Sequence, residues 1–130
     1  MKKLITISVF LAVVVTFSVF ELLYDVKNYQ NISSALETLA VAIENNKDDV
    51  TVREVKEKYA AARDEWEKMS DLSMAITNHN IIRAVGEKFV YLESYIDADV
   101  YSDAVSTTNA LIKVTKDLQR EKYPSLGNIF

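Results

Sequence analysis

The chain has 130 residues, a formal net charge of −4 and no cysteine. From residue 25 onward it carries 13 lysines and arginines against 18 aspartates and glutamates, and this acidic balance argues against nucleic acid or anionic lipid headgroups as partners. Without cysteine there is no disulfide framework and no thiolate site, and two glycines and one proline favour long helices over strands and turns.

The first segment is an uncharged stretch from Leu4 to Phe20, preceded by Lys2 and Lys3. As a helix extended to Tyr24 it spans about 31 Å, which matches a hydrocarbon core of about 30 Å. We therefore expect residues 1–24 to be a membrane anchor in contact with the bilayer through residues 4–24. Because basic residues favour the cytoplasmic side, the amino terminus is expected in the cytoplasm and the rest outside a plasma membrane that the chain crosses once.

A cleaved signal peptide is the alternative interpretation of the same stretch. Thr16 and Ser18 resemble the small residues of a cleavage site, but Phe17, Val19 and Phe20 beside them are bulky. The pattern favours a retained anchor, and the protein is secreted if the segment is removed.

Apolar residues recur every three or four positions in four stretches of the remaining chain, which predicts four amphipathic helices. The stripes are Ile32, Leu36, Leu39 and Ile43; Val52, Val55, Tyr59, Ala62, Trp66 and Met69; Ile82, Val85, Phe89, Leu92 and Ile96; and Tyr101, Ala104 or Val105, Thr108, Leu111 or Ile112, Thr115 and Leu118. No glycine or proline separates the first stripe from the anchor, so one helix can run through both. The fold class is therefore expected to be all-α, with residues 25–122 forming a small antiparallel bundle of about four helices in two hairpins.

Local features refine this prediction. Asp48 or Asp49 is expected to cap the second helix. Gly86 is expected to mark the close approach of a neighbouring helix, because an idle glycine would cost about 1 kcal/mol relative to alanine. A weak echo at an offset of 53 residues, such as Leu36 with Phe89, suits two similar hairpins, and regular helix packing alone would also produce it.

Several of these features together resemble one bacterial family. They are the basic start and apolar anchor, the acidic turn before a helix that ends Asp64-Glu65-Trp66, the later Asn78-His79, and the closing Ser125-Leu126-Gly127-Asn128-Ile129-Phe130. The chain resembles the family called domain of unknown function 4363 over essentially its whole length, most specifically at the Trp66 helix and at Leu126-x-Asn128-Ile129-Phe130. The resemblance implies a short, anchored, all-helical protein of the Gram-positive cell envelope, with no established activity.

The chain departs from that family after His79. Members usually carry a glutamate two residues after this histidine and an aspartate four residues after it, whereas Ile81 and Arg83 occupy those positions here. The resemblance therefore supports fold and location and does not carry a site to His79.

No catalytic, cofactor or metal site is expected. His79 lacks the acidic partner that a metal site or an acid–base pair requires. The three aspartates within 97–103 are spaced like calcium ligands, but Ser102 and Thr108 stand where an EF-hand loop needs glycine and glutamate. The acids beside Trp66 are expected on a solvated helix face.

The candidate partner contacts are Trp66 and four residues of the tail 123–130: Tyr123, Leu126, Ile129 and Phe130. Pro124 prevents the last helix from continuing, and the apolar tail residues would form an exposed patch in water. The tail is expected to fold into a groove between helices of its own bundle, since each buried side chain gains about 1.5–3 kcal/mol, or to dock on another protein. Trp66 is either a core residue or an exposed contact.

These observations predict a membrane-tethered extracytoplasmic interaction or scaffold module without catalytic activity, whose partner is an envelope protein. The alternative is an extracytoplasmic bundle that senses a small molecule or ion through Tyr91, Tyr95 or His79. A sensor of this kind would act through a partner membrane protein, because about three cytoplasmic residues cannot carry an output domain.

Overall fold

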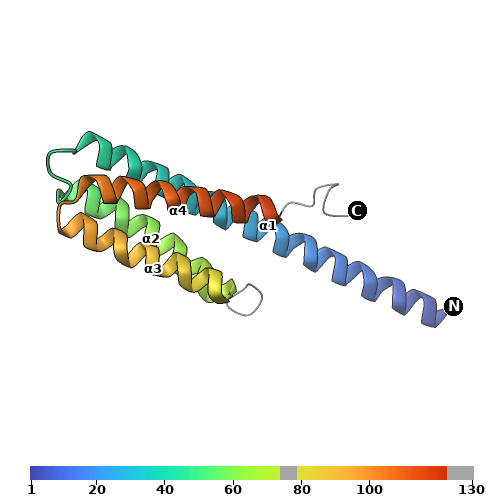
Figure 1. Cartoon of the computed structure of the whole chain (residues 1–130). Helices are drawn as coiled ribbons and strands as arrows, with labels where there is room; N and C mark the ends of the chain where they lie inside the picture. The colour runs from blue at the N-terminus through green and yellow to red at the C-terminus, as the bar shows by residue number, and fades with distance from the viewer. Residues whose placement is uncertain (74–78, 123–130) are drawn as a thin grey trace.

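The structure, a computed structural model, describes residues 1–73 and 79–122. These residues form α1 (Lys2–Asn45), α2 (Arg53–Ser73), α3 (His79–Asp97) and α4 (Tyr101–Lys122), and no strand occurs among them. The predicted all-α class with one long apolar N-terminal helix is confirmed. The carboxy-terminal half of α1 packs against α2 and α4, and its amino-terminal half projects beyond the bundle (Figure 1).

Each packed helix has two neighbours. α1 contacts α2 and α4, and α3 contacts α2 and α4, so the four helices form a closed ring in chain order. The connections 46–52 and 98–100 lie at the end far from the projecting half of α1, while α2 ends and α3 begins near it (Figure 1). The carboxyl end of α4 consequently returns to the place where α1 leaves the bundle.

A continuous apolar core joins all four helices, and the predicted stripes supply it. Its buried members include Ile32, Leu36, Leu39 and Ile43 of α1; Val55, Tyr59, Ala62, Trp66 and Met69 of α2; Val85, Phe89, Leu92 and Ile96 of α3; and Ala104, Leu111 and Leu118 of α4. Thr108 and Thr115 are also buried, and each hydroxyl donates a hydrogen bond of 2.7 Å to the carbonyl four residues earlier. A hydroxyl whose hydrogen bond is made in this way can be buried in an apolar core.

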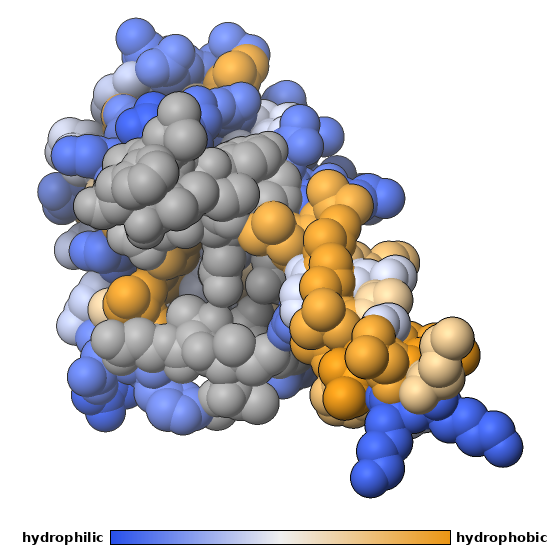
Figure 2. Space-filling view, turned by 90° about the vertical axis from the view of Figure 1, so that its right-hand side faces the viewer, coloured by the Kyte–Doolittle hydropathy of each residue, from blue (hydrophilic) through white to orange (hydrophobic). Residues whose placement is uncertain are grey.

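α1 is one uninterrupted helix, as the absence of glycine and proline predicted. Most of its apolar side chains are exposed as far as Tyr24, with Leu22 half-buried, and the first buried side chain among those described is Tyr29. Figure 2 shows the projecting half as an apolar ridge with a hydrophilic tip, beside a mostly hydrophilic bundle surface. Among the described helices, α1 is long and apolar enough to cross a membrane. A signal sequence meets the same criterion, so both interpretations of residues 1–24 stay predictions.

Three hydroxyls in the projecting half form their hydrogen bonds within the helix. The hydroxyls of Thr6, Thr16 and Ser18 each donate to the carbonyl four residues earlier, at 2.8–2.9 Å. Hydrocarbon offers no hydrogen-bond partners, so a segment that spans a membrane must supply them itself. This geometry suits lipid as well as water.

The connection between α1 and α2 differs from the prediction that Asp48 or Asp49 caps α2. The helix begins at Arg53, and Asp49 Oδ1 instead accepts hydrogen bonds from the Thr51 hydroxyl and from its backbone N–H, the latter at 2.9 Å. These bonds from Thr51 lower the pKa of the Asp49 carboxyl. Aspartate readily bonds a backbone N–H two residues on, and here that local turn takes the place of a helix cap.

The two connections at the far end are tied together by Asp99. Its backbone has φ 56°, in the left-handed region, which aspartate tolerates better than most residues. Its Oδ1 accepts a hydrogen bond of 2.9 Å from the backbone N–H of Val50, whose side chain is fully buried. One residue therefore both reverses the chain between α3 and α4 and fixes the α1–α2 connection against it.

We expect Asp99→Ala to lower the free energy of unfolding by about 1–3 kcal/mol, because it strains the left-handed backbone and leaves the Val50 N–H without its acceptor. Asp99→Gly relieves the strain and loses only the hydrogen bond, so its loss should be smaller. Asp99→Asn keeps both features and should stay near the wild-type value. Urea unfolding of the full chain in detergent micelles, followed by Trp66 fluorescence, measures all three. Equal losses for Asn and Ala would show that the Val50 bond contributes nothing.

The prediction of a close helix approach at Gly86 is wrong. A Cβ built on Gly86 meets no atom within 4 Å. Gly86 precedes Glu93 by seven residues, two helical turns, and so shares the face of α3 that is directed at α2. The seam between α2 and α3 is open at this level.

Gly86→Ala should therefore raise the free energy of unfolding by about 0.5–1 kcal/mol, because alanine restricts the unfolded chain and fits the helix without a clash. Ala84→Gly, at an exposed position of the same helix, is the matched control and should lower it by a similar amount. The same urea titration compares them. Destabilisation by Gly86→Ala would show that a neighbouring element does pack against this position.

Candidate functional site

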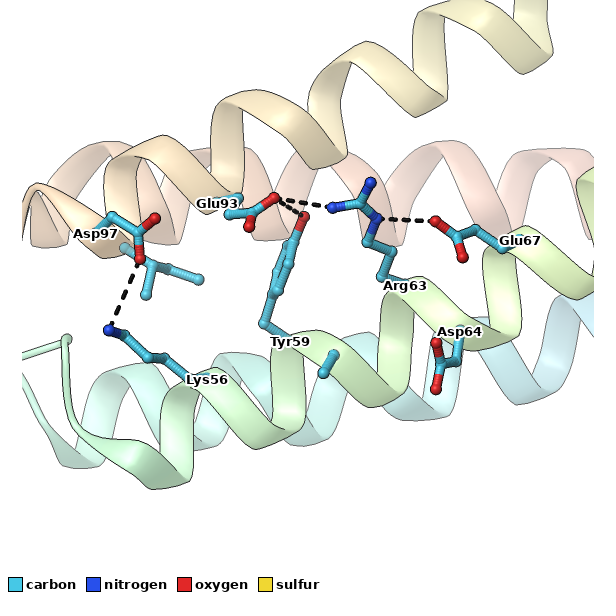
Figure 3. A pocket seen from close by; sticks show the side chains of 9 residues that line it. Lys56, Tyr59, Arg63, Asp64, Glu67, Glu93 and Asp97 are labelled. Carbon is cyan, nitrogen blue, oxygen red and sulfur yellow. Dashed lines mark hydrogen bonds and ion pairs between the residues drawn. The ribbon is translucent and has the colours of Figure 1, made fainter.

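A polar groove lies on the bundle surface between α2 and α3. It encloses about 440 Å³ and is open to solvent along one side. Its lining comes from about three turns of α2 and about one turn of α3: Lys56, Tyr59, Ala60, Arg63, Asp64 and Glu67 of α2, and Glu93, Ile96 and Asp97 of α3 (Figure 3). Cations project from α2 opposite anions on α3, so both signs of charge are presented along its length.

The floor of this seam is aromatic. The Phe89 ring lies 6.1 Å from Trp66 in a stacked arrangement and 6.3 Å from Tyr59 in a tilted one, measured between ring centroids. Aromatic pairs at such distances add about 0.5–1.5 kcal/mol beyond the area they bury. The aromatic contacts close the seam on the inside, and the charged side chains line it on the outside.

Trp66 is thereby assigned to the core. Its side chain is 5% exposed, so the indole offers no surface to a partner. The sequence allowed Trp66 to be either a core residue or an exposed contact, and its burial supports the core residue. The other candidate contacts, Tyr123, Leu126, Ile129 and Phe130, lie outside the described residues.

Arg63 is the centre of the charged rim. Its Nη1 lies 2.8 Å from Glu93 Oε2 across the seam, and its Nε lies 2.9 Å from Glu67 Oε1 one turn along α2. Figure 3 shows the guanidinium held between these two carboxylates. The hydrogen bond to Glu67 is the main cause that raises the pKa of Arg63. Farther along, Lys56 Nζ lies 3.8 Å from Asp97 Oδ1.

Tyr59 joins the floor to the rim. Its hydroxyl donates a hydrogen bond of 2.8 Å to the Phe89 carbonyl and lies 3.4 Å from Glu93 Oε2. Burial, and then the negative charge of Glu93, raise the pKa of Tyr59 to about 12. At neutral pH this phenol is therefore a hydrogen-bond donor and not a base.

The arrangement suits binding. Arginine and lysine can engage carboxylates of a partner, and Glu93, Asp97 and Glu67 can engage its cations. Within residues 1–73 and 79–122, no three side chains among histidine, aspartate and glutamate are placed to hold a metal ion.

The residues considered for a sensor pocket do not converge on the groove. His79 is exposed at the first position of α3, Tyr91 is 57% exposed, and Tyr95 packs at the edge of the core. None of the three lines the groove.

The charged groove residues were missed as a set because the sequence assigned them to solvated faces. A signal was present in their positions. Arg63 follows buried Ala62, and Glu93 follows buried Leu92, so both sit at the border of an apolar stripe. The edges of two stripes face each other only when their helices are neighbours in the ring. The stripe of one helix does not show which helices are its neighbours.

Comparisons with models of protein families, with curated proteins and with solved structures found no match. The resemblance to domain of unknown function 4363 stays a prediction.

Tyr59→Phe should lower the free energy of unfolding by about 0.5–1.5 kcal/mol at neutral pH, the usual net value of one hydrogen bond. It should also change how the free energy of unfolding depends on pH in alkaline solution. Since the folded pKa is raised to about 12 from 10.0, the unfolded chain ionises first, and wild-type stability falls as the pH rises between these values.

The variant lacks this titration and should lose less stability across that window. Urea titrations at pH 7, 9, 10.5 and 11.5 test the difference, with exposed Tyr91→Phe as the control that keeps the wild-type slope. Parallel pH dependence in Tyr59→Phe and wild type would remove the special role of this phenol.

Proposed function

We propose that this protein is a membrane-tethered interaction module. In this proposal the projecting half of α1 crosses the plasma membrane with its amino terminus in the cytoplasm, and the four packed helices form an antiparallel bundle on the outer side. The groove between α2 and α3 receives a segment of an envelope protein. Membership of the domain of unknown function 4363 family, with its Gram-positive envelope location, belongs to the same proposal.

The observation that carries it is the contrast between the two layers of the α2–α3 seam. The inward faces of all four helices are committed to one core, whereas the rim of this seam keeps pairable charges accessible. The ion pairs Arg63–Glu93 and Lys56–Asp97 join side chains that are 39–61% exposed. Pairs this exposed contribute about 0–1 kcal/mol each, so a partner can replace them at little cost to the fold.

The open form of the groove favours a peptide or helix as its occupant. Grooves between helices accept an amphipathic or extended segment that lies along them. The α2 side of the groove carries charges of both signs and the α3 side carries Glu93 and Asp97, and this uneven pattern would favour a segment with matching charges, which supports specificity and orientation.

Small-molecule sensing is the second candidate function. The groove volume of about 440 Å³ falls within the range of ligand pockets, about 300–1,000 Å³. Such pockets usually enclose their ligand, and this one is open along one side. A saturable thermal shift of the full chain with a metabolite or ion, abolished by Arg63→Met, would favour sensing over protein interaction.

Two adjacent alanines of α2 give a matched test. Ala60 lines the groove, whereas Ala61 is exposed and does not line it. A photo-crosslinking amino acid at position 60 of the full chain in native membranes should capture one discrete envelope protein. The same group at position 61 should not.

Lys56→Glu in the chain labelled at position 60 should reduce that capture on the order of fivefold, which corresponds to about 1 kcal/mol of binding free energy. Lys58→Glu makes the same charge change on the same helix outside the groove, and it should leave the capture unchanged. Equal capture from positions 60 and 61, or no capture from either, would contradict an interaction through this groove.

A further inference from the structure

The charges of the α2–α3 groove differ between its two ends (Figure 3). At the end near the connection 46–52, Lys56 faces Asp97 with 3.8 Å between Nζ and Oδ1, so one cation offsets one anion. The half nearer the side from which α1 projects, which we call the proximal half, is lined by the charged residues Arg63, Asp64, Glu67 and Glu93. The described lining of this half thus carries one positive charge and three negative ones.

Arg63 does not neutralise the proximal half. Its guanidinium lies 2.8 Å from Glu93 Oε2 and 2.9 Å from Glu67 Oε1, so one positive charge is shared between two carboxylates. Asp64 is exposed, and no ion pair within residues 1–73 and 79–122 includes it. The proximal half consequently keeps negative charge that no base of its described lining offsets.

α2 extends this negative surface one turn beyond the groove. Asp71 is exposed and follows Asp64 by seven residues, so both lie on the same face of the helix. Glu67 and Asp71 are four residues apart, and like charges at this spacing destabilise an isolated helix by about 0.2–0.5 kcal/mol. The same helix pairs opposite charges at that spacing in Arg53–Glu57. A departure from a local rule of this kind is expected at a site that serves function.

The wall opposite these acids is open. Arg63 pairs with Glu93 and Trp66 stacks on Phe89, so sequence positions rise along α2 as they fall along α3. The turn of α3 that contains Gly86 therefore lies beside the turn of α2 that follows Trp66. A Cβ on Gly86 would meet no atom within 4 Å. A long side chain of a partner can cross the seam at this position and reach the acids of α2.

The spread of the acids suits a protein segment better than a single ion. Asp64 to Asp71 covers about 10 Å along α2 at 1.5 Å per residue. Within the described parts of the chain, no three acidic or histidine side chains are placed to hold a metal ion. Lysine or arginine side chains one helical turn apart, about 5.4 Å, match this spacing, and their long stems suit the open seam.

We propose that the segment received by the α2–α3 groove carries lysine or arginine side chains at its proximal end, where they pair with Asp64, Glu67 and Asp71. This inference rests on the proposed function and adds the charge and the direction of the occupant. At the other end of the groove a carboxylate of the segment pairs with Lys56. A segment with its acid and its bases in this order fits the groove in one direction, because the reverse places bases at Lys56.

The photo-crosslinking group at position 60 of the full chain in native membranes also tests this inference. Mass spectrometry of the crosslinked peptide identifies the captured segment. We expect at least two lysines or arginines within about ten residues of the crosslinked position, because a helical segment of that length, about 15 Å, covers the acids of the proximal half. A captured segment without basic residues would contradict the inference.

A pair of double variants tests the named acids. Asp64→Asn with Asp71→Asn, in the chain labelled at position 60, should reduce the capture on the order of tenfold, since both ion pairs with the partner are lost. Asp48→Asn with Asp103→Asn removes the same charge from exposed positions outside the groove and should leave the capture unchanged. Equal losses from the two double variants would show a general attraction to negative charge and overturn the assigned contact.

Gly86 allows a test that supplies the missing charge from within the chain. Gly86→Arg places a guanidinium in the open seam beside Glu67 and should reduce the capture several-fold, because it competes with the bases of the partner. Gly86→Gln introduces a neutral side chain at the same place and should reduce it less. Equal effects of arginine and glutamine would show that bulk, and not charge, is what matters there.

The two proposals fail in different ways. Capture of one discrete protein from position 60 and not from position 61, through a segment that is acidic or insensitive to Asp64→Asn with Asp71→Asn, overturns the basic occupant and leaves the proposed function intact. Absence of discrete capture from position 60 overturns both together.

Discussion

The structure depends on the continuity of α1. One helix supplies both the exposed apolar surface up to Tyr24 and, from Tyr29 onward, one side of the core. No loop interrupts the helix between these two parts, so the direction of the bundle follows from the direction of the projecting half of α1. A glycine or proline between them would uncouple the two halves, because either residue breaks the run of helical hydrogen bonds or weakens the helix.

Two polar contacts between residues far apart in the sequence also hold the bundle together. Along the packed half of α1, the Lys116–Glu37 pair joins α4 to α1, with 2.6 Å between Nζ and Oε1. At the far end, Asp99 holds the Val50 N–H and joins the two connections. Neither interaction needs to be strong, because the core already favours compact packing. Polar contacts of this kind can favour one register of a helical bundle over others.

The sequence predicted what depends on one helix at a time. Stripes such as Val85, Phe89, Leu92 and Ile96 are buried as expected, because helical period and apolarity decide which face turns inward. Two local predictions failed for related reasons. Asp49 accepts hydrogen bonds from Thr51 instead of capping α2, because a short-range turn competes with a helix cap. Gly86 faces open space, because what lies opposite it depends on how the helices are arranged around the ring. The groove was missed on the same ground, because Arg63 and Glu93 become partners only when α2 and α3 are placed side by side.

Under the proposed function, the α2–α3 seam combines stability in its floor with recognition at its rim. Its floor, built on Phe89 with Trp66 and Tyr59, is dry and aromatic. Its rim carries ion pairs that remain in contact with water. Desolvation makes the floor costly to disturb, and solvent screening makes the rim inexpensive to rearrange. Tyr59 couples the layers through its hydroxyl, so a partner that draws Glu93 away from Arg63 leaves the Tyr59–Phe89 hydrogen bond in place. The rim can therefore exchange partners while the helices that carry it keep their separation, and this separation is what defines the groove.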